Sequence, residues 1–296
     1  MSPSGEFRLD RAAVRRSFGR ASAQYHEAAR LQSAIGAELL GRLQYFPLEP
    51  RVIIDLGAGT GRGAAALRSR FPSARVIAVD LAFPMVQEAR RRQRFWRRYD
   101  CVCADGCALP FAAQSIDLVY CNLMLQWCAE PAQLFEQLQR VLRPGGLLLF
   151  SSFGPATLQE LRGAWASVDT MGHVSAFTDM PQLGEALMKA GLSEPVMDRE
   201  LQLRHYADVY ALMNELRTIG ARHAAADRRR SLTGPHRLRA MAAAYETLRD
   251  EAGLPASWEV ICGAAFAGPV KPDTWDDFSG GRETAIPIGA VRRHRR

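Results

Sequence analysis

The chain has 296 residues, of which 48% are hydrophobic, so it can bury a large core as one domain or as one domain with a sizeable insertion. No apolar stretch approaches the roughly 18 residues of a membrane-spanning helix, and the polar first residues do not resemble a secretion signal. Six cysteines are present without the spacing of a disulfide framework, which predicts a reduced, cytoplasmic protein.

The formal net charge is +7, and most of the positive charge is arginine. The arginines gather in three runs, at residues 90–98, 228–230 and 292–296. Such runs are typical either of solvated helix faces or of a surface that binds an acidic partner, which could be a nucleic acid or an acidic carrier protein. Charge alone does not decide between these alternatives.

The spacing of apolar residues divides the chain into regions. Apolar side chains recur at three- and four-residue steps through residues 8–45, which indicates helices, and we place N-terminal cap helices at residues 1–50. Between residues 51 and 153, strand-like and helix-like segments alternate, which predicts the core of a doubly wound, mostly parallel α/β sheet. Residues 154–267 are expected to add a helical substrate cap and the last two strands. Residues 268–296 are rich in Pro, Gly, Asp and Arg, which predicts a disordered basic tail.

Local signals predict the later elements. Residues 141–146 contain Pro-Gly-Gly and read as a turn into a fifth strand at 147–150. Gly191 follows a predicted helix and is typical of a helix end. Because ligands bind at the carboxyl ends of strands in open α/β sheets, the cap helices should cover that edge. The predicted helices are 157–168, 181–190, 207–219 and 235–251, and the last strands are 196–206 and 258–266.

The most informative segment is residues 52–61, which reads Val-Ile-Ile-Asp-Leu-Gly-Ala-Gly-Thr-Gly. Its apolar, β-branched start predicts a buried parallel strand. Gly57, Gly59 and Gly61 allow a sharp turn and a close approach of the backbone to a ligand, and a helix is expected just beyond them. Asp80 ends the next apolar run, where an acid suits the hydroxyls of a ribose. These residues predict a site for a nucleoside-containing cofactor.

The spacing of the glycines narrows the choice of cofactor. It is G-x-G-x-G, whereas dinucleotide-binding folds have G-x-G-x-x-G and phosphate-binding loops end in a lysine. Asp55 lies inside the motif, where its carboxylate would repel a pyrophosphate and would favour the cationic amino group and sulfonium of S-adenosylmethionine. The segment therefore resembles the first motif of class I S-adenosylmethionine-dependent methyltransferases, which implies their Rossmann-like, seven-stranded sheet.

This resemblance implies further contacts with the cofactor. The segment that contains Asp105 and Gly106 resembles the loop whose acid binds the adenine amino group in that superfamily. Leu81 is next to Asp80 and is expected to touch the adenine. Asn122 ends the predicted fourth strand and is expected to face the methionine moiety.

Several segments resemble one family of that superfamily, the malonyl-acyl-carrier-protein O-methyltransferases of biotin synthesis. Residues 122–128, Asn-Leu-Met-Leu-Gln-Trp-Cys, are similar to the signature of that family. Matching segments at 18–25, 154–169 and 216–221 extend the resemblance over most of residues 14–267. One departure is the pair Ser175-Ala176, where the family often has Asn-Arg.

The family resemblance implies methyl transfer from S-adenosylmethionine to the free carboxylate of a malonyl thioester, carried by acyl carrier protein or by coenzyme A. Gln32 is expected to help line the transfer pocket. The residues expected to act at the transfer are the lid residue Tyr25, the pocket residues Gln126 and Trp127, and His173, which would orient the malonyl group.

No general base is expected, because a carboxylate is already ionised near pH 7. An arginine is expected beside it, because a buried carboxylate without a cation is costly. The sequence does not choose among the candidates Arg162, Arg204, Arg217 and Arg222. We expect the carrier protein to dock on the arginines of 90–98 or 228–230.

Three rival hypotheses share the cofactor motifs. They are a small-molecule C- or O-methyltransferase, for example one acting on a quinone precursor, a non-catalytic S-adenosylmethionine-binding module, and a nucleic-acid methyltransferase. The last is suggested by charge alone, and the Asn-Pro-Pro-Tyr type of motif seen in base methyltransferases is missing after Asn122. We expect a monomer without nucleic-acid or membrane partners, and no metal, since the spacing of Cys101, Cys103 and Cys107 lacks the usual zinc-binding pairs.

Overall fold

The computed structural model describes residues 10–128, 130–170, 172–221 and 234–268. Its centre is a seven-stranded sheet in the order β3-β2-β1-β4-β5-β7-β6. β7 runs antiparallel to its neighbours β5 and β6, and the other neighbouring strands are parallel. The predicted doubly wound, mostly parallel α/β fold is confirmed. The strands are β1 (Val52–Leu56), β2 (Arg75–Asp80), β3 (Asp100–Cys103), β4 (Ile116–Asn122), β5 (Leu142–Phe153), β6 (Leu192–Tyr206) and β7 (Leu254–Ala267).

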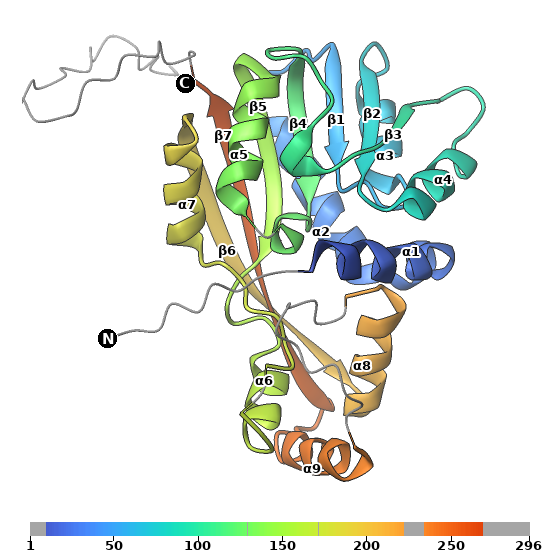
Figure 1. Cartoon of the computed structure of the whole chain (residues 1–296), viewed down its shortest axis with the longest axis vertical. Helices are drawn as coiled ribbons and strands as arrows, with labels where there is room; N and C mark the ends of the chain where they lie inside the picture. Colours follow the sequence, from blue (N-terminus) through green and yellow to red (C-terminus); the bar gives the residue numbers. More distant parts are fainter. Residues whose placement is uncertain (1–9, 129, 171, 222–233, 269–296) are drawn as a thin grey trace, which may run out of the picture.

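Helices cover both faces of the sheet (Figure 1). α2, α3 and α4 pack into the hydrophobic core on one face, and α5 and α7 pack into the core on the other. The α-helices are α1 (Arg11–Ala28), α2 (Arg30–Gly41), α3 (Arg62–Arg70), α4 (Phe83–Arg91), α5 (Pro131–Val141), α6 (Gln159–Ala166), α7 (Met180–Lys189), α8 (Val209–Thr218) and α9 (Pro235–Glu246). Short 3-10 helices are η1 (Arg42–Tyr45), η2 (Gly106–Ala108) and η3 (Leu125–Trp127).

The two-sided burial explains why the central strands read as continuous apolar runs. Successive side chains of a strand point to opposite faces of its sheet. Accordingly, Ile53 packs in the core beneath α2 and α3, whereas its neighbour Ile54 packs in the core beneath α5. Both side chains are fully buried. Such a strand needs an apolar residue at every position, and not at alternate positions.

The last two strands extend beyond the rest of the sheet. β6 and β7 remain paired out to Tyr206 and Leu254, and Figure 1 shows α6, α8 and α9 gathered around this extension. α1 lies across the carboxyl ends of the central strands and contacts α4 on one side and α8 on the other. The cofactor edge of the sheet is therefore covered by α1, and the far cap is built from the β6–β7 extension with its three helices.

Several predicted boundaries differ from the structure: β5, β6 and β7 begin earlier than predicted, and two further differences have a clear local cause. The Pro-Gly-Gly segment predicted as a turn lies inside β5, where Gly145 has a φ of +77° and the pairing with β4 shifts between Ile116 and Leu118. The helix predicted for 235–251 ends at Glu246, because a tight turn closed by a bridge between Asp250 and Gly253 leads into β7. The predicted tail lies outside the described residues from 269 onward. Over the described ranges, no helix is both long enough and apolar enough to cross a membrane.

Candidate active site

The glycine loop follows β1 and is built to let groups approach its backbone. Gly57, Gly59 and Gly61 all have positive φ values, of +74°, +52° and +80°, which side chains other than glycine rarely adopt. A Cβ atom on Gly57 would lie 2.6 Å from the Met124 side chain, and one on Gly59 would lie 3.4 Å from the Tyr25 ring. The loop is tied to β2, because the amide of Gly57 donates to the carbonyl of Val79 at 2.8 Å.

Asp80 stands at the carboxyl end of β2, directly beside this loop. Its Oδ2 accepts from the amide of Gly59 at 2.8 Å, and its Oδ1 accepts from the amide of Ala82 at 2.8 Å. Burial raises the pKa of Asp80, and the two amide donors act in the opposite direction. Two backbone bonds therefore fix the orientation of a carboxylate that also lines the main cavity.

Asp55 is the buried acid of the glycine motif. It is 2% exposed, and its Oδ2 has no hydrogen-bond partner among the described residues. Burial raises its pKa to about 7, the amide of Ala64 opposes this, and the charge of Asp80 adds to it. A buried acceptor without a donor is costly, so the position favours a ligand that brings one.

The loop after β3 supplies a third acid. Asp105 caps η2, because its Oδ1 accepts from the amide of Cys107 at 2.9 Å. Its Oδ2 lies 3.4 Å from the guanidinium of Arg11, at the start of α1. Gly106 and Leu81 line the same cavity as Asp105. The adenine end of the predicted cofactor site thus meets the first turn of the covering helix.

The end of β4 supplies the opposite wall. Asn122 Oδ1 accepts from the hydroxyl of Ser151 at 2.8 Å, and its Nδ2 donates to the carbonyl of Gln32 on α2 at 3.0 Å. Gln126 Nε2 donates to the carbonyl of Leu123 at 2.8 Å, whereas its Oε1 is buried without a partner among the described residues. The same is true of Gln32 Oε1.

α1 covers the site at the carboxyl ends of the central strands. The Phe18 ring contacts Tyr25 and Trp127 edge-on, at centroid distances of 6.2 and 5.0 Å. Burial and the charge of Asp80 raise the pKa of the Tyr25 hydroxyl. This hydroxyl therefore stays protonated and can donate a hydrogen bond.

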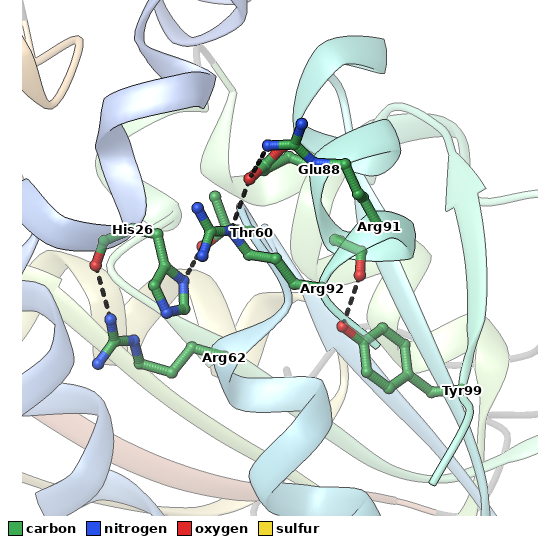
Figure 2. Close-up of polar contacts among 8 residues, drawn as sticks. His26, Thr60, Arg62, Glu88, Arg91, Arg92 and Tyr99 are labelled. Atoms are coloured by element: carbon green, nitrogen blue, oxygen red, sulfur yellow. Dashed lines mark hydrogen bonds and ion pairs between the residues drawn. The ribbon is translucent and has the colours of Figure 1, made fainter. Parts of the chain in front are cut away.

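The carboxyl end of α1 is fastened to the glycine loop (Figure 2). His26 Nδ1 lies 3.0 Å from the Thr60 hydroxyl, and Arg62 Nη2 donates to the carbonyl of His26 at 2.6 Å. Burial and the charges of Arg62 and Arg92 lower the pKa of His26. A neutral His26 therefore makes the contact that holds Tyr25 over Gly59.

These elements enclose two adjoining cavities. The main one comprises about 1010 Å³ of empty space, part of it open to solvent. The second, of about 710 Å³, lies against Asp55, Thr60 and Arg62, and shares Gly57, Gly59 and other wall residues with the first. Predicted residues that line the main cavity are Tyr25, Gln126, Trp127, Gly57, Gly59, Asp80, Leu81, Asp105, Gly106 and Asn122.

Two predicted residues lie elsewhere. Gly61 lines neither cavity and instead caps the start of α3, where a Cβ would collide with the Tyr99 hydroxyl. His173 lines a separate cavity beside α6, is stacked on Trp165 at 3.8 Å, and has Nε2 2.8 Å from Asp169 Oδ1. The structure therefore does not bring His173 together with the other predicted residues.

The candidate arginines are distributed over the far cap. Arg204 pairs with Glu215 at 3.4 Å, and Arg217 donates to Asn214 at 2.7 Å. Among the described residues, Arg162 donates to the backbone carbonyls of Pro155, Thr157 and Ser175, and burial lowers its pKa. It lines the cavity that contains His173. Arg222 lies outside the described residues.

Sequence reasoning missed several wall residues. Arg11, Phe153 and Ile219 line the main cavity but belong to no local motif, and Met124 lies within the 122–128 signature without having been singled out. In the described part of the chain, no cluster of three or more His, Cys, Asp or Glu side chains could hold a metal ion.

The groups present fit S-adenosylmethionine. Asp55 Oδ2, Gln32 Oε1 and Gln126 Oε1 are buried acceptors that lack donors, and an ammonium group brings three donors and a positive charge. The glycine loop leaves its backbone open to close approach, and Asp80 and Asp105, which were predicted to bind a ribose and an adenine amino group, both line the main cavity. Acids and amide oxygens in such an arrangement suit a cation that carries several hydrogen-bond donors.

Comparison with known proteins gives consistent results. Residues 54–150 match the family model described as "Methyltransferase domain". A malonyl-[acyl-carrier protein] O-methyltransferase of Xylella fastidiosa (strain M23) is 46% identical over 285 residues, covering 96% of each chain. A protein of the same name from Halorhodospira halophila is 40% identical over 298 residues, covering 100% of each chain.

Solved structures show the same fold at lower identity. The YcgJ protein from Bacillus subtilis matches with a TM-score of 0.56 and 16% identity, over 78% of this chain and 98% of that one. The [4+2]-cyclase SpnF matches with a TM-score of 0.50 and 21% identity, over 80% and 82%. Because a cyclase shares the fold, the fold by itself does not identify the reaction.

Proposed function

Since the chain belongs to the family of malonyl-[acyl-carrier protein] O-methyltransferases, we propose that it methylates the free carboxylate of malonyl-acyl carrier protein, with S-adenosylmethionine as methyl donor. The product is a malonyl thioester methyl ester, an early intermediate of biotin synthesis. The observation that carries the cofactor assignment is the set of three buried acceptors without donors, Asp55 Oδ2, Gln32 Oε1 and Gln126 Oε1.

Each part of the cofactor has a matching group. Asp80, held by two amides, would bind the ribose hydroxyls. Asp105 would accept from the adenine amino group. Asp55 and Gln32, which both line the second cavity, would bind the ammonium group, whose charge favours ionised Asp55. When bound, S-adenosylmethionine supplies an electrophilic methyl group on a positively charged sulfur.

The methyl transfer needs no general acid or general base. One oxygen of the malonyl carboxylate forms a bond to the methyl carbon as the bond from that carbon to sulfur breaks. No proton moves, because the carboxylate is ionised at neutral pH. An anion and a cation neutralise each other in the transition state, so positioning and the exclusion of water carry the rate. Phe18, Tyr25 and Trp127 would exclude water beneath α1.

A cation near the malonyl group would offset the cost of burying its carboxylate. Arg162 is the best supported of the described candidates, because its acceptors among the described residues are neutral backbone carbonyls and it would gain most from an anion. His173 lines the same cavity. Phe177 of that cavity packs 6.0 Å from Phe153 of the main cavity, so wall residues of the two cavities are in contact.

The proposal places this activity in the cytoplasm. All six cysteines are free, which accords with action in the reducing cytoplasm.

The direct test is an incubation of the purified protein with malonyl-acyl carrier protein and methyl-labelled S-adenosylmethionine. We expect mass spectrometry to detect a methyl ester on the malonyl group. Matched reactions contain acetyl-acyl carrier protein, which lacks the free carboxylate and should stay unlabelled. Transfer to both carriers, or to neither, would contradict the proposal.

A further inference from the structure

The net charge of the protein is concentrated in one short part of the chain. Residues 62–100 contain ten arginines and three acids, a net charge of +7, which equals the formal charge of all 296 residues. The rest of the chain is therefore neutral in sum. This segment forms α3, β2, α4 and the loop into β3, and α3 and α4 pack on the same face of the sheet. This one segment thus carries a net charge equal to that of the whole chain.

The loop between α4 and β3 also exposes two large aromatic side chains. Phe95 and Trp96 are 78% and 76% exposed, and they lie between arginines on both sides. The guanidinium of Arg98 lies 5.1 Å from the centroid of the Phe95 ring, within cation–π distance. Aromatic and arginine side chains are the residues most enriched at the centres of protein interfaces. We define the docking surface as the exposed residues Arg90, Arg91, Arg92, Arg94, Phe95, Trp96, Arg97 and Arg98.

The backbone beneath this surface is fastened to the core. Tyr99 is buried, and its hydroxyl donates to the carbonyl of Ala89 at 3.0 Å (Figure 2). Gln93 Nε2 donates to the carbonyl of Tyr99 at 2.8 Å, and Arg68 Nε donates to the carbonyl of Arg98 at 3.2 Å. The exposed aromatic rings therefore stand on an anchored loop, which lowers the entropy lost when a partner binds them.

Few acids neutralise the surface. Arg91 and Arg92 both pair with Glu88, at 2.8 and 2.6 Å. Arg90 and Arg94 form no ion pair within the described ranges. One carboxylate thus serves the whole run of arginines, and the surface keeps a strong positive field.

The surface is connected to the active site. α4 carries Met85 in the wall of the main cavity and Arg90 and Arg91 in its last turn, and nine helical residues span only about 13 Å. Arg92 acts on the pKa of His26, which lines the second cavity. A protein bound here would stand beside the rim of the site.

We propose that the docking surface binds the acidic face of the carrier protein that presents the malonyl thioester, with Phe95 and Trp96 packing on apolar side chains between its carboxylates. This rests on the proposed function. Of the two arginine runs predicted to dock the carrier, 228–230 lies outside the described residues, and the observations favour 90–98. An acidic protein suits the surface better than a nucleic acid, because the base-methyltransferase motif is missing after β4.

The test compares one reaction on two substrates, malonyl-acyl carrier protein and malonyl-coenzyme A, which share the thioester but not the protein. In Phe95→Ala/Trp96→Ala and in Arg90→Glu/Arg94→Glu, we expect the KM for the carrier substrate to rise at least tenfold. The kcat, the KM for malonyl-coenzyme A and the Kd for S-adenosylhomocysteine should not change. The matched controls are Tyr45→Ala and Arg239→Glu, which should behave as the parent protein. Tyr45 is an aromatic residue on η1 that is 74% exposed, and Arg239 is exposed on α9.

Direct binding separates failure of this inference from failure of the proposed function. Calorimetry with unloaded carrier protein needs no methyl transfer, and both double variants should lose at least tenfold in affinity. If the parent binds carrier through this surface but methylates nothing, only the proposed function fails. Unchanged carrier affinity in both double variants would overturn the inference. The inference would also be overturned if the double variants lost binding to anionic vesicles or RNA but kept their affinity for the carrier protein.

Discussion

The cofactor edge of the sheet and the far cap differ in the buried polar atoms that they leave without partners among the described residues. At the edge, the buried atoms that lack partners among the described residues are acceptors, on Asp55, Gln32 and Gln126. In the cap, the corresponding buried atoms on β6 and β7 are the hydroxyl of Tyr206 and the indole nitrogen of Trp258. The indole nitrogen can only donate. The cofactor edge thus offers acceptors that suit a cation, whereas the far cap holds Arg162 and an indole donor.

The rest of the cap is paired internally. Glu160 accepts from the amide of Ser257 at 2.9 Å, and the Tyr245 hydroxyl donates to the carbonyl of Pro255 at 2.8 Å. Such pairs stabilise the β6–β7 extension and leave nothing for a ligand. The difference teaches that buried groups without partners mark binding sites better than the number of polar residues does.

The largest effect is expected from removing the acid at the end of β2. Asp80→Ala takes away the acceptor of two loop amides and the expected partner of the ribose, so affinity for S-adenosylhomocysteine should fall about a hundredfold or more by calorimetry. Asp117→Ala is the matched control. Asp117 accepts from the amides of Arg51 and Val52 at the other end of the sheet, so its loss should lower stability and leave affinity unchanged. Equal affinity losses in both variants would contradict the assignment.

The next largest effect is expected from Arg162→Gln, which tests whether the far cap binds the malonyl carboxylate. Arg162→Gln should raise the KM for the malonyl substrate roughly tenfold, because a buried carboxylate loses its cation. Cofactor affinity should not change. Arg204→Gln breaks the pair with Glu215 and should lower the melting temperature without this change in KM. An unchanged KM in Arg162→Gln would show that Arg162 does not bind the malonyl carboxylate.

The pH dependence of cofactor binding tests the edge as a cation site. The pKa of Asp55 is raised to about 7 in the free protein, and only the ionised form favours an ammonium group. Affinity should therefore rise about tenfold between roughly pH 6 and 8 and then level off. In Asp55→Asn the titration should lose this step. An identical pH profile in the variant would show that Asp55 does not control binding.

The same shift has a consequence for stability. The folded pKa of Asp55 lies above its ordinary value, so the folded protein holds a proton that the unfolded chain releases. The free energy of unfolding should fall as the pH rises from about 4 to about 7. Urea denaturation of the cofactor-free protein and of Asp55→Asn measures this, and the variant should show the smaller fall.

The smallest effect is expected at the lid. Tyr25→Phe keeps the ring over Gly59 and removes only the hydroxyl, so kcat/KM should fall a few-fold, about the value of one hydrogen bond. Tyr25→Ala also removes the ring that covers the site, and should cost clearly more. Equal losses in the two variants would show that the hydroxyl, and not the cover, carries the function of Tyr25.

The cofactor edge was largely predictable from the sequence. The glycine loop, Asp55, Asp80 and Asp105 depend on short segments, in which strand, turn and helix start follow one another along the chain. The Pro-Gly-Gly segment was predicted less well, because pairing with β4 overrides a local preference for a turn. His173 was placed by resemblance with the transfer residues, but stacking on Trp165 and the bond to Asp169 hold it in a side cavity.

By itself, the sequence determined the α/β class, the glycine turn and the acids at the strand ends, because these follow from apolar periodicity and local backbone requirements. Only the tertiary structure decided that α1 covers the site through His26 and Thr60, and that β6 and β7 extend to build the cap. It also packed α3 and α4, which carry arginines of residues 62–100, on the same face of the sheet. These features join residues far apart in the chain, and such contacts depend on how helices and strands pack and not on any local pattern.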